Sequence, residues 1–356
     1  MERLTLIVSN KCNMNCTYCY ANGGNYHLRE SLMNAQMATS IFDHFLNHFG
    51  AIRQVLFFGG EPLLAVPVIE AVCNHAKSLL RKKRIPKMPK FATVTNGTLI
   101  EDSDSFVEVA KKYNIAVTVS LDGPEKLNDK SRKMKNGEGS FQKIINGFHR
   151  LNKEKIPYSI ECTYTPRHLD ENWSLGELYS YLRSLDPQNV ILVEEMFSSQ
   201  SKESIEFSAK VLPQWIRLFD KAIKDWEKKG EMHIAGPEKI LNAIAFKPKL
   251  LAERFCEGGL DSFTVNHEGM VYPCHILNNE KKFCMGYYKE VTKKEELLPR
   301  KDDIEDCSSC IIRDYCQTCP AKMYAASGNE CFKPVKSQCN INKAVYLLAK
   351  KLLSKT

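Results

Sequence analysis

Short apolar segments alternate with longer amphipathic segments along the first half of the chain. The short segments are rich in β-branched and aromatic residues without polar alternation, as expected for strands buried on both faces of a sheet. Amphipathic stretches between them, for example 37–49, 68–80 and 140–152, predict helices. Strands joined by helical crossovers indicate an α/β fold, here a partial (β/α)6 barrel of the TIM type. Six strands are predicted, at residues 4–9, 54–60, 91–97, 116–123, 158–165 and 189–196.

Polar and glycine residues gather where several of these strands end, in the sequences FFGGEP, TVTNGT and VSLDGP. In a parallel barrel the carboxyl ends of the strands form the face on which loops assemble the active site. Turn formation alone would explain any one of these residues. Their recurrence at successive strand ends favours a site at this face.

Four segments follow from the patterns along the whole chain. The barrel is expected over residues 1–200 and a helical bridging segment over 201–255. From 256 to 342 the apolar periodicity fades and cysteines dominate, which favours a small domain held by metal rather than by a large apolar core. A last amphipathic stretch predicts a C-terminal helix over 343–356.

The bulk composition indicates a folded globular protein, since 43% of the residues are hydrophobic, 26% are charged and no tract is of low complexity. No apolar run is long enough to span a bilayer, and the start of the sequence lacks the cleavage site of a secretion signal. We therefore expect a cytoplasmic protein with no membrane or nucleic-acid partner. The net charge is +8, and the one dense basic run, 81–87, is interpreted as a solvated helix end.

Fourteen cysteines in a reducing compartment point to metal ligands or catalytic groups rather than disulfides. Cys73 and Cys162 lie alone in a helix and a strand pattern and are expected to be plain buried residues. Cys12, Cys16 and Cys19 form a C-x3-C-x2-C cluster directly after the first strand. Zinc with a fourth ligand from elsewhere is one interpretation. A 4Fe-4S cluster is the other, because three thiolates leave one iron open for a reactive ligand.

With Tyr18 before its last cysteine, this motif resembles the radical S-adenosylmethionine (SAM) superfamily. The resemblance implies that Cys12, Cys16 and Cys19 hold a 4Fe-4S cluster, which delivers one electron to SAM and yields a 5′-deoxyadenosyl radical. An electron donor such as flavodoxin or ferredoxin is then a partner. The resemblance also implies contacts of Glu61 with the SAM amino group, Ser120 with the ribose and Arg132 with the carboxylate. The full set implied to bind SAM is Tyr18, Gly59, Gly60, Glu61, Asn96, Ser120, Asp122 and Arg132.

The C-terminal cysteines, in the pattern CxxC-x5-CxxC with further cysteines on either side, could by themselves form a zinc ribbon. Beside a radical SAM motif they are similar to the SPASM extension, which implies two auxiliary clusters and three 4Fe-4S clusters in all. One cluster would take Cys256, Cys274 and Cys319, and the other Cys307, Cys310, Cys316 and Cys339. The family usually has three residues, not two, before the cysteine aligned with Cys319. Cys284 or Cys331 is an alternative fourth ligand of the first cluster, which could also keep an iron open for a substrate thiol.

SPASM proteins mostly modify peptides or proteins. In those that make formylglycine in sulfatases, an aspartate follows the cysteine of the YPC motif, whereas this chain has His275 there. The YPCH sequence is similar to that of thioether-forming maturases, so His275 is a candidate catalytic residue, although it could only pack beside a cluster. We expect a maturase that installs a cysteine thioether in a ribosomally synthesised precursor peptide.

Other radical modifications remain alternatives: epimerisation, carbon-carbon cross-linking and sulfatase maturation. A non-enzymatic iron-sulfur electron carrier is an alternative from a different class. Because the first predicted strand follows the start of the sequence directly, no leader-recognition domain is expected before it. Substrate recognition would then use the barrel, the bridging segment, the basic run or a separate leader-recognition protein.

Overall fold

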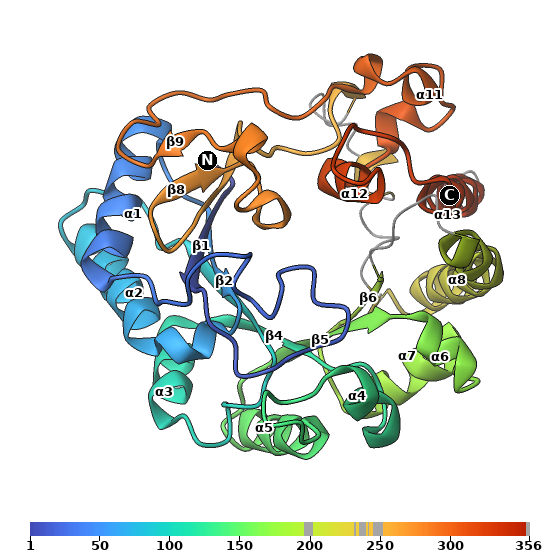
Figure 1. Ribbon diagram of the computed structural model, residues 1–356, viewed down its shortest axis with the longest axis horizontal. Helices are drawn as coiled ribbons and strands as arrows, with labels where there is room; N and C mark the ends of the chain where they lie inside the picture. Colours follow the sequence, from blue (N-terminus) through green and yellow to red (C-terminus); the bar gives the residue numbers. More distant parts are fainter. Residues whose placement is uncertain (196–201, 231–232, 235–239, 241, 245–251, 354–356) are drawn as a thin grey trace. The chain divides into compact units, whose positions relative to one another are not determined.

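The computed structural model describes residues 1–195, 202–230, 233–234, 240, 242–244 and 252–353. The chain forms two compact units, and each is built from two separate stretches of sequence. The first unit holds Met1–Ser159 and Gly258–Leu297, and the second holds Ile160–Glu257 and Leu298–Thr356. Figure 1 follows the chain through both.

The first unit is built on a sheet whose strands run in the order β4-β3-β2-β1-β7-β8-β9. The predicted strands are confirmed as β1 (Arg3–Ser9), β2 (Gln54–Gly59), β3 (Lys90–Thr95) and β4 (Ala116–Ser120), which pair in parallel. Three further strands were not predicted, because they are only two to four residues long: β7 (Ser262–Val265), β8 (Met270–Tyr272) and β9 (Gly286–Tyr287). β7 joins β1 in parallel, and β8 and β9 continue the sheet antiparallel.

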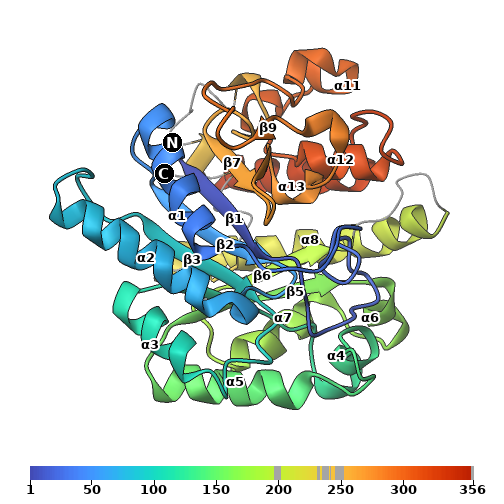
Figure 2. The same ribbon diagram turned by 60° about the vertical axis from the view of Figure 1, so that its left-hand side comes forward.

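Helices between the parallel strands bury their apolar faces against this sheet. They are α1 (Ala35–Phe49), α2 (Val66–Arg81), α3 (Asp104–Tyr113), α4 (Glu125–Ser131) and α5 (Phe141–Lys153). The side chain of Asn34 caps the first turn of α1, and Ser103 caps that of α3. Figure 2 shows α1 and α2 running along one face of β1, β2 and β3. Continuous burial of β1 from Leu4 to Ser9 confirms the interpretation of apolar runs as buried strands.

The stretch Pro62–Arg81 passes a test of length and composition for a membrane-spanning helix, with a mean hydropathy of 1.3. We expected no apolar run to be long enough to span a membrane, and for this stretch that expectation is wrong. Its apolar side chains are buried inside the protein, among them Val68, Ile69 and Val72. A core helix of a folded protein accounts for them. At the end of this helix, the side chains of Arg81–Arg84 are exposed, which confirms the interpretation of the basic run as a solvated helix end.

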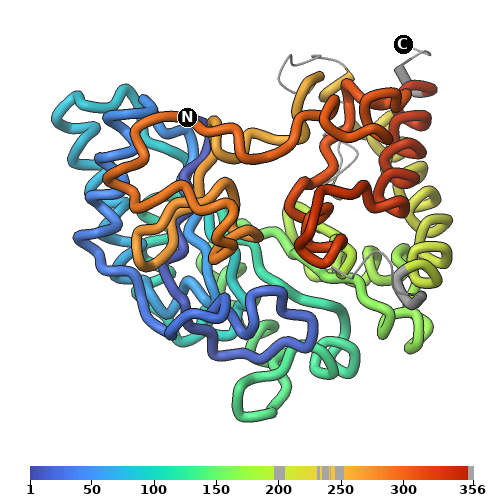
Figure 3. Tube along the Cα trace, turned by 45° about the horizontal axis from the view of Figure 1, so that its top comes forward, coloured from blue at the N-terminus to red at the C-terminus, as the bar shows by residue number. Residues whose placement is uncertain are grey.

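The second unit contains the end of the strand series and the cysteine-rich region. β5 (Tyr158–Tyr164) pairs in parallel with β6 (Val190–Glu194), and α6 (Pro166–Asp170) and α7 (Leu175–Ser184) connect them. The long helix α8 (Lys202–Lys229) lies beside the last helix, α13 (Lys336–Leu353), as Figure 3 shows. The last helix begins at 336 rather than at the predicted 343, because Ile341, Val345 and Ala349 are buried at helical spacing. The predicted helix that leads to residue 254 lies largely outside the described residues.

Short helical turns dominate the cysteine-rich part of the second unit. They are η4 (Lys301–Asp303), α11 (Glu305–Ser308), η5 (Arg313–Tyr315) and α12 (Pro320–Ala326). In the first unit, two similar turns follow β8, at η2 (His275–Leu277) and η3 (Lys281–Phe283). None of these elements exceeds seven residues.

Candidate active site

The three N-terminal cysteines lie in the loop between β1 and α1. The Met14 N–H donates to Cys12 Sγ at 3.4 Å, and the Cys19 N–H donates to the Cys16 carbonyl at 3.2 Å. Burial raises the pKa of Cys12 to about 12, and the negative charges of Glu61, Cys16 and Cys19 act in the same direction. The three thiols are thus close enough to influence one another. Within the described part of the chain, no three His, Cys, Asp or Glu side chains converge as a site for a single metal ion.

Two glycines let the cysteine loop approach the end of β2. A Cβ on Gly60 would lie 2.4 Å from the Lys11 carbonyl oxygen and 3.1 Å from the Cys12 nitrogen. A Cβ on Gly24, later in the loop, would lie 2.4 Å from Gly60 Cα. Any side chain at either position would push the two segments apart. Gly60 of the GGEP sequence therefore lets the end of β2 approach the chain's own cysteine loop closely.

Glu61 is completely buried, and both of its oxygens accept hydrogen bonds from the chain itself. Oε1 accepts from the Leu63 N–H at 2.9 Å and from Thr95 Oγ1 at 2.7 Å, and Oε2 accepts from the Asn96 N–H at 2.7 Å. Burial raises the pKa of Glu61, whereas these donors and the charge of Arg132 lower it. The carboxylate thus ties the end of β2 to the end of β3. Contact with a SAM amino group stays a prediction for this residue.

Asn96 connects the end of β3 to the cysteine loop. Its Nδ2 donates to Asn13 Oδ1 at 2.8 Å and lies 3.8 Å from Cys12 Sγ. Its Oδ1 accepts from the N–H and the hydroxyl of Thr98. Ser120, the other predicted SAM contact on a strand end, is half-buried at the end of β4.

Tyr18, Asp122 and Arg132 form a buried hydrogen-bonded chain, although the three residues are far apart in sequence. The Tyr18 hydroxyl donates to Asp122 Oδ2 at 2.5 Å and accepts from Arg132 Nη1 at 2.8 Å. Burial holds the pKa of Tyr18 well above its usual value, so the phenol keeps its proton. Arg132 is 6% exposed, and its positive charge lowers the pKa of Cys16 against the larger effect of burial. A fixed cation therefore lies beside the second cysteine of the motif.

This arrangement fits the carboxylate of SAM. Arg132 Nε is buried and has no hydrogen-bond partner among the residues that the structure describes. A buried guanidinium N–H without an acceptor is costly, and a bidentate carboxylate is the ligand that a guanidinium fork matches best. Arg132 would hold that carboxylate next to the cluster that Cys12, Cys16 and Cys19 would bind.

His275 lies at the same end of β2. Its ring packs against Phe58 with a centroid distance of 4.5 Å and against Tyr20 at 6.4 Å. Burial, together with the charge of Arg3, lowers the pKa of His275 to about 4. The imidazole is therefore uncharged at physiological pH, so one of its ring nitrogens carries no proton.

Four of the C-terminal cysteines line one cavity of about 310 Å³ in the second unit. They are Cys307, Cys310, Cys316 and Cys339, the set assigned to one auxiliary cluster. A water molecule needs only about 10–15 Å³ of such space, so a polyatomic group fits between the thiols. Single-ion zinc binding would instead bring four sulfurs to about 2.3 Å from one point. The geometry favours a cluster over a zinc ribbon.

The other predicted ligands are placed as follows. Cys256, Cys319 and Cys331 belong to the second unit, and none of them lines this cavity, whereas Cys274 and Cys284 belong to the first unit. Cys284 hydrogen-bonds to Tyr272, and Cys274 interacts electrostatically with Tyr20 and Tyr26 of the cysteine loop. The ligand set of the first auxiliary cluster therefore stays a prediction. Cys73 and Cys162 are fully buried, as expected.

Sequence reasoning missed two residues around these sites. Asn13 accepts a hydrogen bond from Asn96 and donates to Thr98 Oγ1 at 2.8 Å, so it fixes the cysteine loop against β3. Its position inside the C-x3-C spacing is the one signal that could have drawn attention to it. Lys301 is fully buried and lines the four-cysteine cavity. The sequence RKDDIEDC around it is typical of an exposed turn and gives no such signal.

Several known proteins are similar to this chain in sequence. The Radical SAM superfamily model matches residues 6–178. An uncharacterised protein of Methanocaldococcus jannaschii is 29% identical over 294 residues, which cover 82% of this chain and 91% of the relative. The cysteine-type anaerobic sulfatase-maturating enzyme of Clostridium novyi is 28% identical over 316 residues, 83% of this chain and 79% of the relative.

Solved structures agree with the fold. Native anSMEcpe with bound AdoMet, another name for SAM, has a TM-score of 0.78 at 21% identity and covers 100% of this chain and 99% of its own. The same protein with bound AdoMet and the Cp18Cys peptide has a TM-score of 0.76 at 20% identity, covering 99% and 98%.

Residues 6–178 match the Radical SAM superfamily, whose enzymes use SAM and a 4Fe-4S cluster, and the fold is that of a partial TIM-type barrel. Over most of its length the chain is similar in sequence to a sulfatase-maturating enzyme, and it shares the fold of anSMEcpe. Its C-terminal cysteines fit auxiliary clusters.

Proposed function

We propose that this radical SAM enzyme modifies a cysteine-containing, ribosomally synthesised peptide and joins the cysteine sulfur to a carbon atom in a thioether. The observation that carries the SAM site is buried Arg132 beside Cys16, with an Nε that lacks an acceptor in the described part of the chain. When bound, the cluster and SAM supply the 5′-deoxyadenosyl radical that abstracts hydrogen. The barrel residues then have two tasks, to orient SAM and to keep water away from the radical.

In this proposal, the predicted site residues of the first unit have separate tasks. Cys12, Cys16 and Cys19 hold the cluster, and Arg132 holds the SAM carboxylate while Tyr18 fixes its guanidinium. Asn96 and Glu61 fix the ends of β2 and β3 against the cysteine loop. Ser120 contacts the ribose. In the second unit, Cys307, Cys310, Cys316 and Cys339 hold an auxiliary cluster.

Thioether formation removes two hydrogens from the peptide. One leaves in 5′-deoxyadenosine, and the other leaves as a proton, together with one electron. His275 is the candidate that accepts this proton on a ring nitrogen, and its place against Phe58, next to Gly59 and Gly60, supports the assignment. An electron partner such as flavodoxin or ferredoxin supplies the electron for SAM cleavage and can take this one back. Such a partner, and a separate leader-recognition protein, would work with the enzyme in the cytoplasm.

Formylglycine formation is the second candidate, because the Clostridium novyi relative is named a cysteine-type anaerobic sulfatase-maturating enzyme. The two reactions leave different products on the same cysteine. A thioether retains the sulfur and lowers the peptide mass by two hydrogens. Formylglycine loses the sulfur and carries an aldehyde that reacts with hydrazines.

The experiment combines reconstituted, reduced enzyme with SAM and with the short cysteine-containing peptide encoded beside its gene. We expect 5′-deoxyadenosine and a peptide that has lost two hydrogens and its free thiol. An aldehyde product from a sulfatase-derived peptide would instead establish formylglycine formation. Unchanged mass with an inverted stereocentre would indicate an epimerase. Loaded clusters without any SAM cleavage would indicate an electron carrier.

A further inference from the structure

A lysine lies at the wall of the four-cysteine cavity of the second unit. Lys301 is fully buried, and it lines the cavity together with Cys307, Cys310, Cys316 and Cys339. Lysine is almost never fully buried in proteins without a compensating partner. Its burial here therefore requires an explanation from its surroundings.

The contacts that hold the Lys301 ammonium in place include a hydrogen bond and an aromatic ring. Nζ donates to the backbone carbonyl of Arg313 and lies 5.7 Å from the centre of the Phe255 ring. A position over an aromatic face favours the charged form of the amine. Burial lowers the pKa of Lys301, and the charge of Arg313 acts in the same direction, whereas the charges of Cys316, Asp314 and Cys307 oppose it. Lys301 and the thiols assigned as cluster ligands are thus close enough to act on each other electrostatically.

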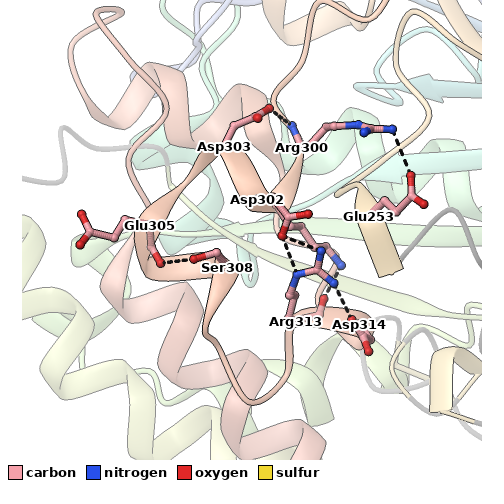
Figure 4. A network of polar contacts seen from close by, with 9 residues as sticks. Glu253, Arg300, Asp302, Asp303, Glu305, Ser308, Arg313 and Asp314 are labelled. Carbon is pink, nitrogen blue, oxygen red and sulfur yellow. Dashed lines mark hydrogen bonds and ion pairs between the residues drawn. The ribbon is translucent and has the colours of Figure 1, made fainter.

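The side chain of Arg313, whose carbonyl accepts from Lys301, belongs to a surface network that Figure 4 shows. The Arg313 side chain donates to Asp302 Oδ1 through Nε at 3.1 Å and Nη2 at 2.7 Å, and to Asp314 through Nη1 at 2.9 Å. Asp302 and Asp314 thereby neutralise Arg313 on the outside of the turn. On the cavity side of the same turn, Lys301 is held by the Arg313 carbonyl.

Other charges around the cavity favour an anionic occupant as well. Among the described residues, the charged side chains that line it are four cations and one carboxylate: Lys301, Arg313, Lys336, Lys343 and Asp306. Lys336 is exposed to solvent, whereas Lys301 is not. Because water and salt screen exposed charges far more than buried ones, Lys301 has the strongest effect on the cavity.

We propose that Lys301 sets the reduction potential of the auxiliary cluster in this cavity by stabilising its reduced form. The inference rests on the assignment of Cys307, Cys310, Cys316 and Cys339 as the ligands. Four thiolates give such a cluster a negative net charge, and uptake of one electron makes it more negative. A fixed buried cation therefore stabilises the reduced state more than the oxidised state and raises the potential. The electron comes from the external donor or from the peptide during turnover.

The test is an anaerobic redox titration of the full-length, iron-loaded protein, followed by electron paramagnetic resonance. The signal lost in Cys310→Ala identifies the cluster in question. Lys301→Gln removes the charge and keeps an N–H donor for the Arg313 carbonyl, and Lys301→Arg keeps the charge. Lys336→Met is the matched control, because it removes an exposed lysine from the rim of the same cavity. Iron and sulfide are counted in every variant.

We expect Lys301→Gln to shift the midpoint to a more negative potential and to retain this shift at high ionic strength. Lys301→Arg and Lys336→Met should stay close to the unmodified protein. A midpoint of Lys301→Gln equal to that of Lys336→Met, with a full iron count, would overturn the proposal. If Lys301→Gln fails to load the cluster while Lys301→Arg loads it, Lys301 serves assembly and the proposal is wrong. If no signal depends on Cys310, the ligand assignment fails instead.

Discussion

The Tyr18 hydroxyl is the point through which two distant charged residues act on the N-terminal cysteine loop. It donates to Asp122 and accepts from Arg132, which lie 104 and 114 residues further along the chain. A phenol in this position orients the guanidinium without adding charge. Tyr18 is therefore a positioning residue for the proposed carboxylate ligand of SAM.

Replacement of Tyr18 by Phe removes this bridge and keeps the ring. A hydrogen bond to a charged group contributes roughly 1.5–3 kcal/mol, and part of this is recovered when Arg132 finds another acceptor. We expect Tyr18→Phe to raise the dissociation constant for SAM about tenfold, which corresponds to about 1.4 kcal/mol. Iron content should be unchanged. Calorimetric titration of SAM into the reconstituted protein measures this difference.

Tyr113→Phe is the matched control for this prediction. The Tyr113 hydroxyl contacts Asn74 in an exposed part of α3, away from the cysteine loop. It should leave SAM affinity unchanged. Equal SAM affinity in both variants would show that the Tyr18 hydroxyl does not position Arg132.

Glu61→Gln provides a second test at the scale of single residues. A glutamine amide has one oxygen and one NH2 group, so the NH2 group must face the N–H of either Leu63 or Asn96, both of which are donors. A buried donor left without an acceptor costs roughly 1–3 kcal/mol. We expect Glu61→Gln to lower the urea midpoint of the first unit, measured by circular dichroism. Glu70→Gln, which changes an exposed ion pair with Lys112, should have a much smaller effect.

Some site residues could be predicted from the sequence, and others could not. The cysteine spacing is a local pattern, so the sequence alone identifies Cys12, Cys16 and Cys19 as a group. Apart from Leu63, the partners of Glu61 and Tyr18 are between 34 and 114 residues away from them. No local pattern specifies such pairs. Lys301 was missed for the same reason, since its burial depends on residues such as Phe255 and Cys339.

At the scale of secondary structure, β1 to β6 were predicted to within three residues at each end. Their continuous apolar runs are produced by burial on both faces, which is a local property of a parallel sheet. The short strands β7, β8 and β9 carry too few residues to show any period. β7 is a strand because it pairs with β1, a partner that is distant in sequence. Residues Arg3–Leu6 of β1 pair with Ser262–Val265 of β7.

Helix α8 is tied to the end of β6 by one buried hydrogen bond. Trp215 Nε1 donates to Glu194 Oε1 at 2.6 Å, and burial raises the pKa of that carboxyl. Trp215→Phe leaves Glu194 without this donor, so we expect a loss of roughly 1.5–3 kcal/mol in the free energy of unfolding of the second unit. Thermal denaturation followed by circular dichroism tests it. Trp226→Phe changes a residue on the same helix that is 36% exposed, and it should be close to neutral.

At the scale of the molecule, the two compact units differ in what holds them together. The first unit rests on a sheet with fully buried strands, whereas the cysteine-rich part of the second is a series of short turns. Short turns without a large apolar core depend on cross-links or metal for their stability. The sequence predicted this contrast through the loss of apolar periodicity after 256. It did not predict that residues 258–297 join the first unit, because the chain returns there through the pairing of β7 with β1.

Removal of iron should therefore affect the two units unequally. After chelation under reducing conditions, we expect amide hydrogen exchange to become fast over residues 300–343 and in the loop that holds Cys12. The strands β1 to β4 should keep their protection, because their hydrogen bonds and burial do not involve metal ligands. Cys310→Ser should reproduce the change over 300–343 without chelation, and Cys73→Ala, in the core of α2, should not. Equal loss of protection in both units would contradict the assignment of the clusters, because the parallel sheet would then depend on iron as much as the cysteine-rich turns do.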